Sequence, residues 1–446
     1  MATDNIDTNN NSTPISADQS VDTRDFRIGE ITLIGSDGVA HEISPLVAEL
    51  QIRQDIYLGF MSGEMLITDG VDMHSQIAFH GEEYVYIDIR EPEQELAIKK
   101  AFRVYKVSTR TPIQNNYQRY IVYFVSDELV SSSTSKVSKA YKGSKVSSIA
   151  LDILQNYLHV PDTQILYDET SVPVDLIVPN LRPHDALNWL AYRAYTSDDP
   201  CFLFYENLHG FNFRSLSSIY KQGTVIKVPF VFENKSGMKA MDMDKYAIDS
   251  WEGKVDFDVL NQVNSGGYAM SLLGLDPFHQ SFTTQNYPLD KTGKKLFANP
   301  PMTNTKDEDG VFLFDRGSTH FLTYLDTEAT STEKASGTRE WVKGVMSLAA
   351  LQHSMMELVI PGSIRIEIGT LVSLRFPYAT TPSDGSSIWD KRKSGRYLIV
   401  AVNHKFDLLN HRFDTIFMVA RDSVPEPYTS DPDIQSKIKK MNRQTK

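Results

Sequence analysis

Pairs of carboxylates are the residues of this sequence best suited to carry out chemistry. Asp127 is followed directly by Glu128, and Asp307 lies two residues before Asp309. Two carboxyl groups at the right separation in space can act as acid and nucleophile in glycoside hydrolysis. A chain with 57 acidic residues contains many such neighbours by chance. Solvated turns are therefore the expected role of these pairs, and a hydrolase acting on cell-wall polymer is the alternative.

Other signatures of catalysis or metal binding are missing from the sequence. It contains no G-x-S-x-G, P-loop, G-x-G-x-x-G or H-E-x-x-H motif. The eleven histidines are scattered and lack the short spacing of a local zinc site. Residues 305–316 resemble a calcium loop, but Thr305 and Arg316 stand where its first and last carboxylates are needed. We predict no catalytic residue, no metal and no cofactor.

Composition restricts the possible partners and the cellular setting. The 45 basic and 57 acidic residues give a net charge of -12, which disfavours a protein that grips phosphate backbones. Cys201 is the only cysteine, so no intrachain disulfide is expected. No stretch approaches the ~20 consecutive apolar residues of a membrane-spanning helix. The sequence predicts a soluble protein made in the cytoplasm, without stable membrane insertion.

One strand-like run is apolar on both faces. In RYIVYFVSDELV, residues 119–130, Tyr120, Val122 and Phe124 share one side, while Ile121, Tyr123 and Val125 share the other. A strand with one solvated face should alternate between apolar and polar residues, so both sides of this strand are expected to be covered. The cover is either a second layer of the same chain or another subunit.

The pattern along the chain predicts several folded units. A helix is expected over Val146 to Tyr157, with Ser144 as its N-cap, and a second helix begins at Pro183. A hairpin turns at residues 207–210, and a third helix surrounds Trp341. The expected units are a polar arm (1–24), a β-barrel (25–130), an α+β module (131–200), a second β-barrel (201–250 with 338–424), a loop-rich insertion (251–337), and a tail with a short helix (425–446).

The order of several segments resembles a known family. YIVYFVSDELV, SKAYKGSKVSSIALDIL, LRPHDALNWLAYRA and CFLFYENLHGFNFRSL follow one another, and NSGGYAMSLLGLDP, ELVIPGSIRIEIGTLVSLRFP and SGRYLIVAVNHKFD continue the series. The succession resembles the central baseplate hub proteins of contractile-tailed (myovirus) bacteriophages, which are related to the N-terminal hub region of VgrG spike proteins. The resemblance covers roughly residues 25 to 425. It implies a mainly β fold with α+β modules, built from two tail-tube-like antiparallel β-barrels plus inserted smaller modules.

The resemblance also implies a function. Three chains would form a homotrimer whose six barrels match the sixfold tail tube, or a tube-initiator protein, to the threefold central spike. Such a ring would contact other baseplate proteins and let DNA pass through its lumen without sequence-specific binding. It would be assembled in the host cytoplasm and located in the virion. The hub half of a type VI secretion spike is a further alternative, although the chain ends too early to hold a fused needle domain.

Candidate interface residues follow from the two-faced apolar strand, the aromatic hairpin, an expected helix and loop at Ser138 to Gly143, and the basic C-terminal stripe. They are Tyr120, Val122, Phe124, Tyr141, Phe204, Tyr205, Phe211, Ile434, Ile438 and Met441.

Overall fold

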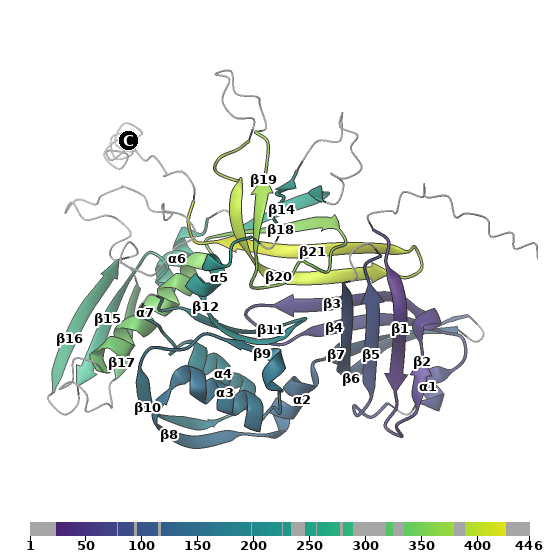
Figure 1. The fold of residues 1–446 in the computed structure, drawn as a ribbon, viewed down its shortest axis with the longest axis horizontal. Helices are drawn as coiled ribbons and strands as arrows, with labels where there is room; N and C mark the ends of the chain where they lie inside the picture. The colour runs from purple at the N-terminus through teal and green to yellow at the C-terminus, as the bar shows by residue number, and fades with distance from the viewer. Residues whose placement is uncertain are drawn as a thin grey trace, which may run out of the picture.

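The computed structural model has a mainly β fold, as predicted (Figure 1). The structure describes residues 24–77, 79–92, 96–114, 117–197, 199–224, 226–232, 246–255, 257–276, 280–288, 318–323, 334–378 and 389–424. The largest element is one 13-stranded sheet, and three smaller sheets accompany it. The predicted arm before Arg24, and the tail helix in 425–446, lie outside the described residues.

Eight neighbouring strands of the large sheet, paired antiparallel throughout, run across the molecule (Figure 1). Their spatial order is β14-β18-β21-β20-β3-β4-β7-β6. The bounds are β3 Val47–Asp55, β4 Ser62–Asp69, β6 Ala97–Gln114, β7 Tyr117–Val125, β14 Ser250–Val255, β18 Ser354–Pro361, β20 Gly395–Asp407 and β21 Arg412–Arg421.

These eight strands are two copies of one four-stranded unit. In chain order, β3, β4, β6 and β7 form the first unit, and β14, β18, β20 and β21 form the second. Each unit places its first strand at one edge, then the second, the fourth and the third. The third strand of each unit also pairs through its early half with a further strand, β5 (Tyr84–Arg90) in the first unit and β19 (Leu371–Arg375) in the second. The chain therefore contains a structural duplication.

The two units are joined by pairing between β20 and β3. Asp407 lies opposite Glu49, and the antiparallel register continues to Ala401 opposite Asp55. We call this line of contact the seam. The predicted pair of β-barrels is thus a pair of barrel-like halves that share one sheet. They share it because β20, the third strand of the second unit, pairs with β3, the first strand of the first unit.

Each half buries its own apolar core, and the seam connects the two cores. The first core lies inside β3, β4, β6 and β7 and is closed by β5, β1 (Arg27–Ile34) and β2 (Ala40–Glu42). The second core lies under β18, β20 and β21. Phe406 and Phe413, which come from β20 and β21, belong to the first core and stack with ring centroids 4.2 Å apart. Ile56, just beyond β3, belongs to the second core.

An α+β module packs below the large sheet in Figure 1. Helices α3 and α4 lie between a ribbon of β8 and β10 and the three-stranded sheet β11-β12-β9, and share one core with them. The bounds are α2 Asp127–Thr134, β8 Val137–Lys145, α3 Val146–Asn156, β9 Ile165–Tyr167, β10 Pro173–Leu181, α4 Pro183–Ala191, β11 Phe202–Asn207, β12 Gly210–Ser215 and α5 Leu216–Lys221.

A second module lies between β14 and β18 along the chain. Its sheet, β16-β15-β17, packs against α7 through Met270, Val342 and Met346. The bounds are α6 Val259–Ser265, β15 Ala269–Asp276, β16 Ser281–Pro288, β17 Ser318–Thr323 and α7 Lys334–Leu351. The short elements α1 Met73–Gln76 and β13 Phe230–Val231 complete the assignment, with the 3-10 turns Ser44–Leu46 and Asp162–Gln164.

Two local predictions differ from the structure. Ser144 is not an N-cap, because β8 continues through Lys145 and the helix begins at Val146. The hairpin 202–215 was assigned to the second barrel, yet β12 pairs in parallel with β9 in a separate sheet. The helix beginning at Pro183 and the turn between Asn207 and Gly210 are confirmed.

The buried His404 should make the fold sensitive to acid. Burial lowers its pKa to about 3, whereas an exposed histidine titrates near 6.5. Below about pH 6.5 the unfolded chain binds a proton at His404 that the folded chain does not bind, so this residue should lower stability by about 1.4 kcal/mol per pH unit until the pH approaches its folded pKa. Burial also lowers the pKa of His353 to about 4, which adds a similar dependence. Urea midpoints measured from pH 7.5 to 4.5 should show this loss. His404→Leu should reduce the slope, and an unchanged slope would contradict the assignment.

Neighbouring aromatic side chains of β7 should differ sharply in their contribution to stability. Phe124 is fully buried in the first core, whereas Tyr123 lies on the outer face. Phe124→Ala should lower the free energy of unfolding by about 3 to 5 kcal/mol, the cost of a large cavity. Tyr123→Ala is the matched control and should cost clearly less in the same urea titration. Equal losses would mean that the strand is covered on both sides within one chain.

Candidate assembly surface

Three of the predicted interface residues are core residues of the chain itself. Tyr120, Val122 and Phe124 are each fully buried in the first core. The interface prediction is wrong for them because the layer formed by β5 and β1 already covers that side of β7. Apolar groups on the opposite side of β7, Ile121 and Tyr123, stay partly exposed.

The aromatic hairpin is also internal. Phe204 and Phe211 stack at 6.0 Å in the core of the α+β module. Tyr205 points to the other side and is buried in the second core. The hairpin is apolar on both faces because it lies between two cores of the same chain. The interface prediction is therefore wrong for these three residues.

The remaining predicted contacts have different outcomes. Tyr141 lies on β8, so the segment Ser138 to Gly143 is a strand where a helix and loop were expected. Its hydroxyl donates to Asp152 Oδ2 over 2.5 Å. Burial, helped by this bond, raises the pKa of Tyr141. The side chain is partly exposed, and its role as a contact stays a prediction. Ile434, Ile438 and Met441 lie outside the described residues.

The one predicted carboxylate pair that the structure describes lies at the beginning of a helix. Asp127 and Glu128 occupy the first turn of α2, where negative charge is favourable. Asp127 accepts a hydrogen bond from the Tyr84 hydroxyl over 3.0 Å. Asp307 and Asp309 lie outside the described residues. No group of three or more His, Cys, Asp or Glu side chains suited to a metal occurs among the described residues.

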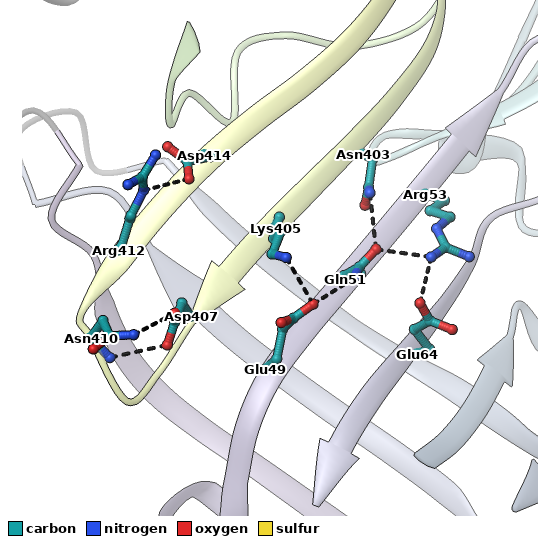
Figure 2. Close-up of polar contacts among 10 residues, drawn as sticks. All are labelled: Glu49, Gln51, Arg53, Glu64, Asn403, Lys405, Asp407, Asn410, Arg412 and Asp414. Carbon is teal, nitrogen blue, oxygen red and sulfur yellow. Dashed lines mark hydrogen bonds and ion pairs between the residues drawn. The ribbon is translucent and has the colours of Figure 1, made fainter. Parts of the chain in front are cut away.

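The outer face of the eight strands is continuous across the seam and polar along it. Figure 2 shows that Gln51 connects both units, because its side-chain oxygen accepts from Arg53 over 2.8 Å and from Asn403 over 3.0 Å. Arg53 also pairs with Glu64 over 2.5 Å, and Lys405 pairs with Glu49 over 3.2 Å (Figure 2). Basic groups at the seam thus lie against carboxylates of neighbouring strands.

A hollow opens on this face beside the paired charges. Residues from both units line it, among them Asp55, Phe60, Glu357, Asn403 and Met418. Its wall combines carboxylates and apolar side chains with Arg53, whose charge is paired with Glu64. It therefore offers little attraction to a phosphate group.

Both ends of the eight-stranded series present an unpaired strand edge among the described residues. β6 pairs with β5 only through Arg103, and from Tyr105 to Gln114 its single partner is β7. At the other end, β14 pairs with β18 alone along Ser250 to Val255. Exposed edges of this kind favour association with another strand. We call them the β6 edge and the β14 edge.

The sequence analysis missed the β14 edge, because it predicted a loop-rich insertion over these residues. The signal was the short alternation in SWEGKV, with Trp251, Gly253 and Val255 on one side and Glu252 and Lys254 on the other. Trp251 packs against Phe376 with ring centroids 5.3 Å apart, which fixes this alternation toward the second core.

Known structures share this architecture. No protein-family model matches the sequence, and no curated protein matches it. A tail protein from Neisseria meningitidis MC58 superposes with a TM-score of 0.53 at 8% identity, over 90% of this chain and 98% of that chain. The 43 kDa tail protein of prophage MuSo2 from Shewanella oneidensis gives 0.52 at 12% identity, over 88% and 98%. The chain thus has the fold of these phage tail proteins.

A third structure extends the comparison. A component of the type VI secretion system of E. coli, described as similar to T4 tail proteins, superposes with a TM-score of 0.43 at 9% identity, over 91% of this chain and 79% of that chain. The likeness to tail proteins implied by the sequence is confirmed at the level of the fold.

A buried carboxylate fixes the hairpin to the first half of the tail-protein fold. Glu206 of β11 is fully buried. Its Oε2 accepts from the Met61 N–H over 2.8 Å and from Ser126 Oγ over 2.6 Å, and its Oε1 pairs with Lys100 Nζ. Burial raises the pKa of nearby Glu128, and the charge of Glu206 adds to that effect. The α+β module is thereby held at a defined position against the barrel-like half.

Within the described ranges, no helix is long and apolar enough to cross a bilayer.

Removing the charge of Glu206 should weaken the junction between hairpin and barrel. Glu206→Gln leaves Lys100 without its buried counter-ion, so the free energy of unfolding should fall by about 2 to 3 kcal/mol. Glu169→Gln is the matched control, because Glu169 pairs with Lys145 over 2.6 Å on the surface and should change little. Urea denaturation measures both. A loss no larger than that of the control would contradict a stabilising role of the buried pair.

Proposed function

We propose that this chain is the structural hub of a contractile phage tail baseplate. Three copies form a ring, and the six barrel-like halves of that ring join a sixfold tail tube to a threefold central spike. The observation that carries the proposal is the duplicated four-stranded unit, since two equivalent units in each of three chains give the ring approximate sixfold symmetry. The tail-protein fold of the two best-matching structures described above supports it.

The ring has no catalytic task in this proposal. Its mechanism is symmetry matching and binding, with one side contacting the tube or a tube-initiator protein and the other contacting the spike. Other baseplate proteins bind its periphery, where the α+β module and the partly exposed Tyr141 are available. The protein is assembled in the host cytoplasm and works in the virion.

The eight-stranded outer face lines the passage through which DNA leaves. Two features support this assignment. Arg53, Lys405 and Lys254 are each paired with a carboxylate on that face, and the whole chain carries a net charge of -12. Cations that are paired in this way hold a sliding phosphate backbone only weakly.

The mass of the purified protein in solution tests this proposal. A ring of three chains should be found at micromolar concentration, and low-resolution images should show a threefold torus with six lobes. A chain that stays monomeric at high concentration contradicts the ring. Turnover of peptidoglycan or another glycan that disappears when one Asp or Glu is neutralised would instead favour the hydrolase.

A further inference from the structure

We infer that the ring closes by strand pairing between the β6 edge of one copy and the β14 edge of the next, in the register of the seam. This inference rests on the proposed function and specifies its subunit contact. Each copy would add eight strands to one closed sheet, and the seam inside the chain is the template for the contact between chains.

The third strands of the two units match in detail. β20 pairs with β19 through its first residues, breaks register between Ile399 and Ala401, and then pairs with β3. β6 pairs with β5 through Arg103, breaks register between Val104 and Lys106, and then has its second edge unpaired among the described residues. The same irregularity thus occurs at the same point of both units. The β6 edge therefore corresponds to the edge of β20 that pairs with β3.

The first strands match as well. QIRQDI at 51–56 aligns with EGKVDF at 252–257, and in this alignment Lys254 occupies the position of Arg53. The alignment is supported by an ion pair, since Arg53 meets Glu64 over 2.5 Å on the second strand of its unit and Lys254 meets Glu357 over 3.4 Å on the second strand of the other. β14 differs in one respect, a register shift against β18 between Gly253 and Val255 that β3 and β4 lack at this point. Up to Lys254, the β14 edge is therefore the counterpart of the β3 edge that joins β20.

This correspondence gives the register of the contact. In the seam, Asn403 lies opposite Arg53 and Lys405 lies opposite Gln51. Ser108 is the counterpart of Asn403, which places it opposite Lys254 of the next copy. A second register shift of β6 against β7, between Ser108 and Thr111, makes Thr111 the counterpart of Lys405 and places it opposite Glu252.

Exposed apolar residues lie where the contact needs them. Beyond β3, the Ile56 N–H donates to the Val400 carbonyl over 2.8 Å, and the Ile56 side chain is 1% exposed because it enters the second core. Its counterpart Phe257 is 72% exposed in the single chain. The counterpart of Val400 is Tyr105, which is 52% exposed on the β6 edge. Pairing of the two edges would cover both aromatic side chains, as Ile56 and Val400 are covered in the seam.

Disulfide formation between introduced cysteines tests the register. Residues directly opposite in an antiparallel pair have Cα atoms about 4.5 to 5.5 Å apart, within reach of a disulfide. Ser108→Cys combined with Lys254→Cys should give covalent dimers and trimers on a non-reducing gel after mild oxidation. Thr111→Cys with Glu252→Cys should do the same. Native Cys201 will not interfere, because it is buried and burial raises the pKa of its thiol.

The seam provides the matched control. Asn403→Cys with Arg53→Cys should form a disulfide within one chain, so free thiols disappear while the mass on the gel stays that of one chain. Mass measured in solution separates the two proposals. Threefold rings whose β6 and β14 cysteines fail to link, while the seam pair links, would overturn the strand pairing and leave the ring intact. A monomer at high concentration would overturn both.

A single substitution gives an independent readout. Phe257→Ser should raise the dissociation constant of the ring by about tenfold to a hundredfold, the effect of losing one buried aromatic side chain. Phe282→Ser is the control, because Phe282 is similarly exposed at 66% but lies on β16, away from both edges. Equal effects of the two substitutions would contradict the assigned contact. Neither side chain supports the fold of the single chain, so both variants should remain folded.

Discussion

The antiparallel pairing of β20 with β3 is the interaction on which the rest of the architecture depends. It turns two four-stranded units into one sheet and fixes which side chains of each unit point inward. A slip of one residue would turn Phe406 out of the first core and expose it on the polar face. Because Phe406 and Ile56 each enter the core of the opposite unit, the seam is reinforced on its inner side by apolar packing and on its outer side by Gln51, Arg53 and Lys405.

Much of this fold could be predicted from local patterns. The strand at 119–130, the hairpin around residues 207–210 and the helix beginning at Pro183 follow from periodicity and turn chemistry, which are properties of neighbouring residues. The seam could not be predicted in this way, since it joins residues some 350 positions apart along the chain, as the bond between Gln51 and Asn403 illustrates. A strand of six residues such as β14 gives too short an alternation to stand out from a loop-rich stretch.

The interface prediction failed for a related reason. Apolar residues on both sides of a strand show that both sides are covered, but they do not show what covers them. For Tyr120 and Phe124 the cover is another layer of the chain, and for Phe204 and Tyr205 it is a pair of internal cores. The surface that we propose for assembly consists of strand edges with isolated exposed aromatic residues such as Tyr105 and Phe257, which form no marked hydrophobic pattern in the sequence. An edge is recognised only when the neighbour of every strand is known.

The insertion between β14 and β18 leaves and re-enters the sheet at adjacent points, since Val255 lies opposite Met355. Strands paired in a sheet are about 4.8 Å apart, so the two ends of this excursion are almost in contact. A segment attached in this way puts no tension on the sheet, whatever its length. The sheet can consequently accept a larger or smaller domain at this position, provided that Leu351, which is buried in the second core, is kept. This makes the segment between Val255 and Leu351 a natural site for diversification and for the insertion of a foreign protein.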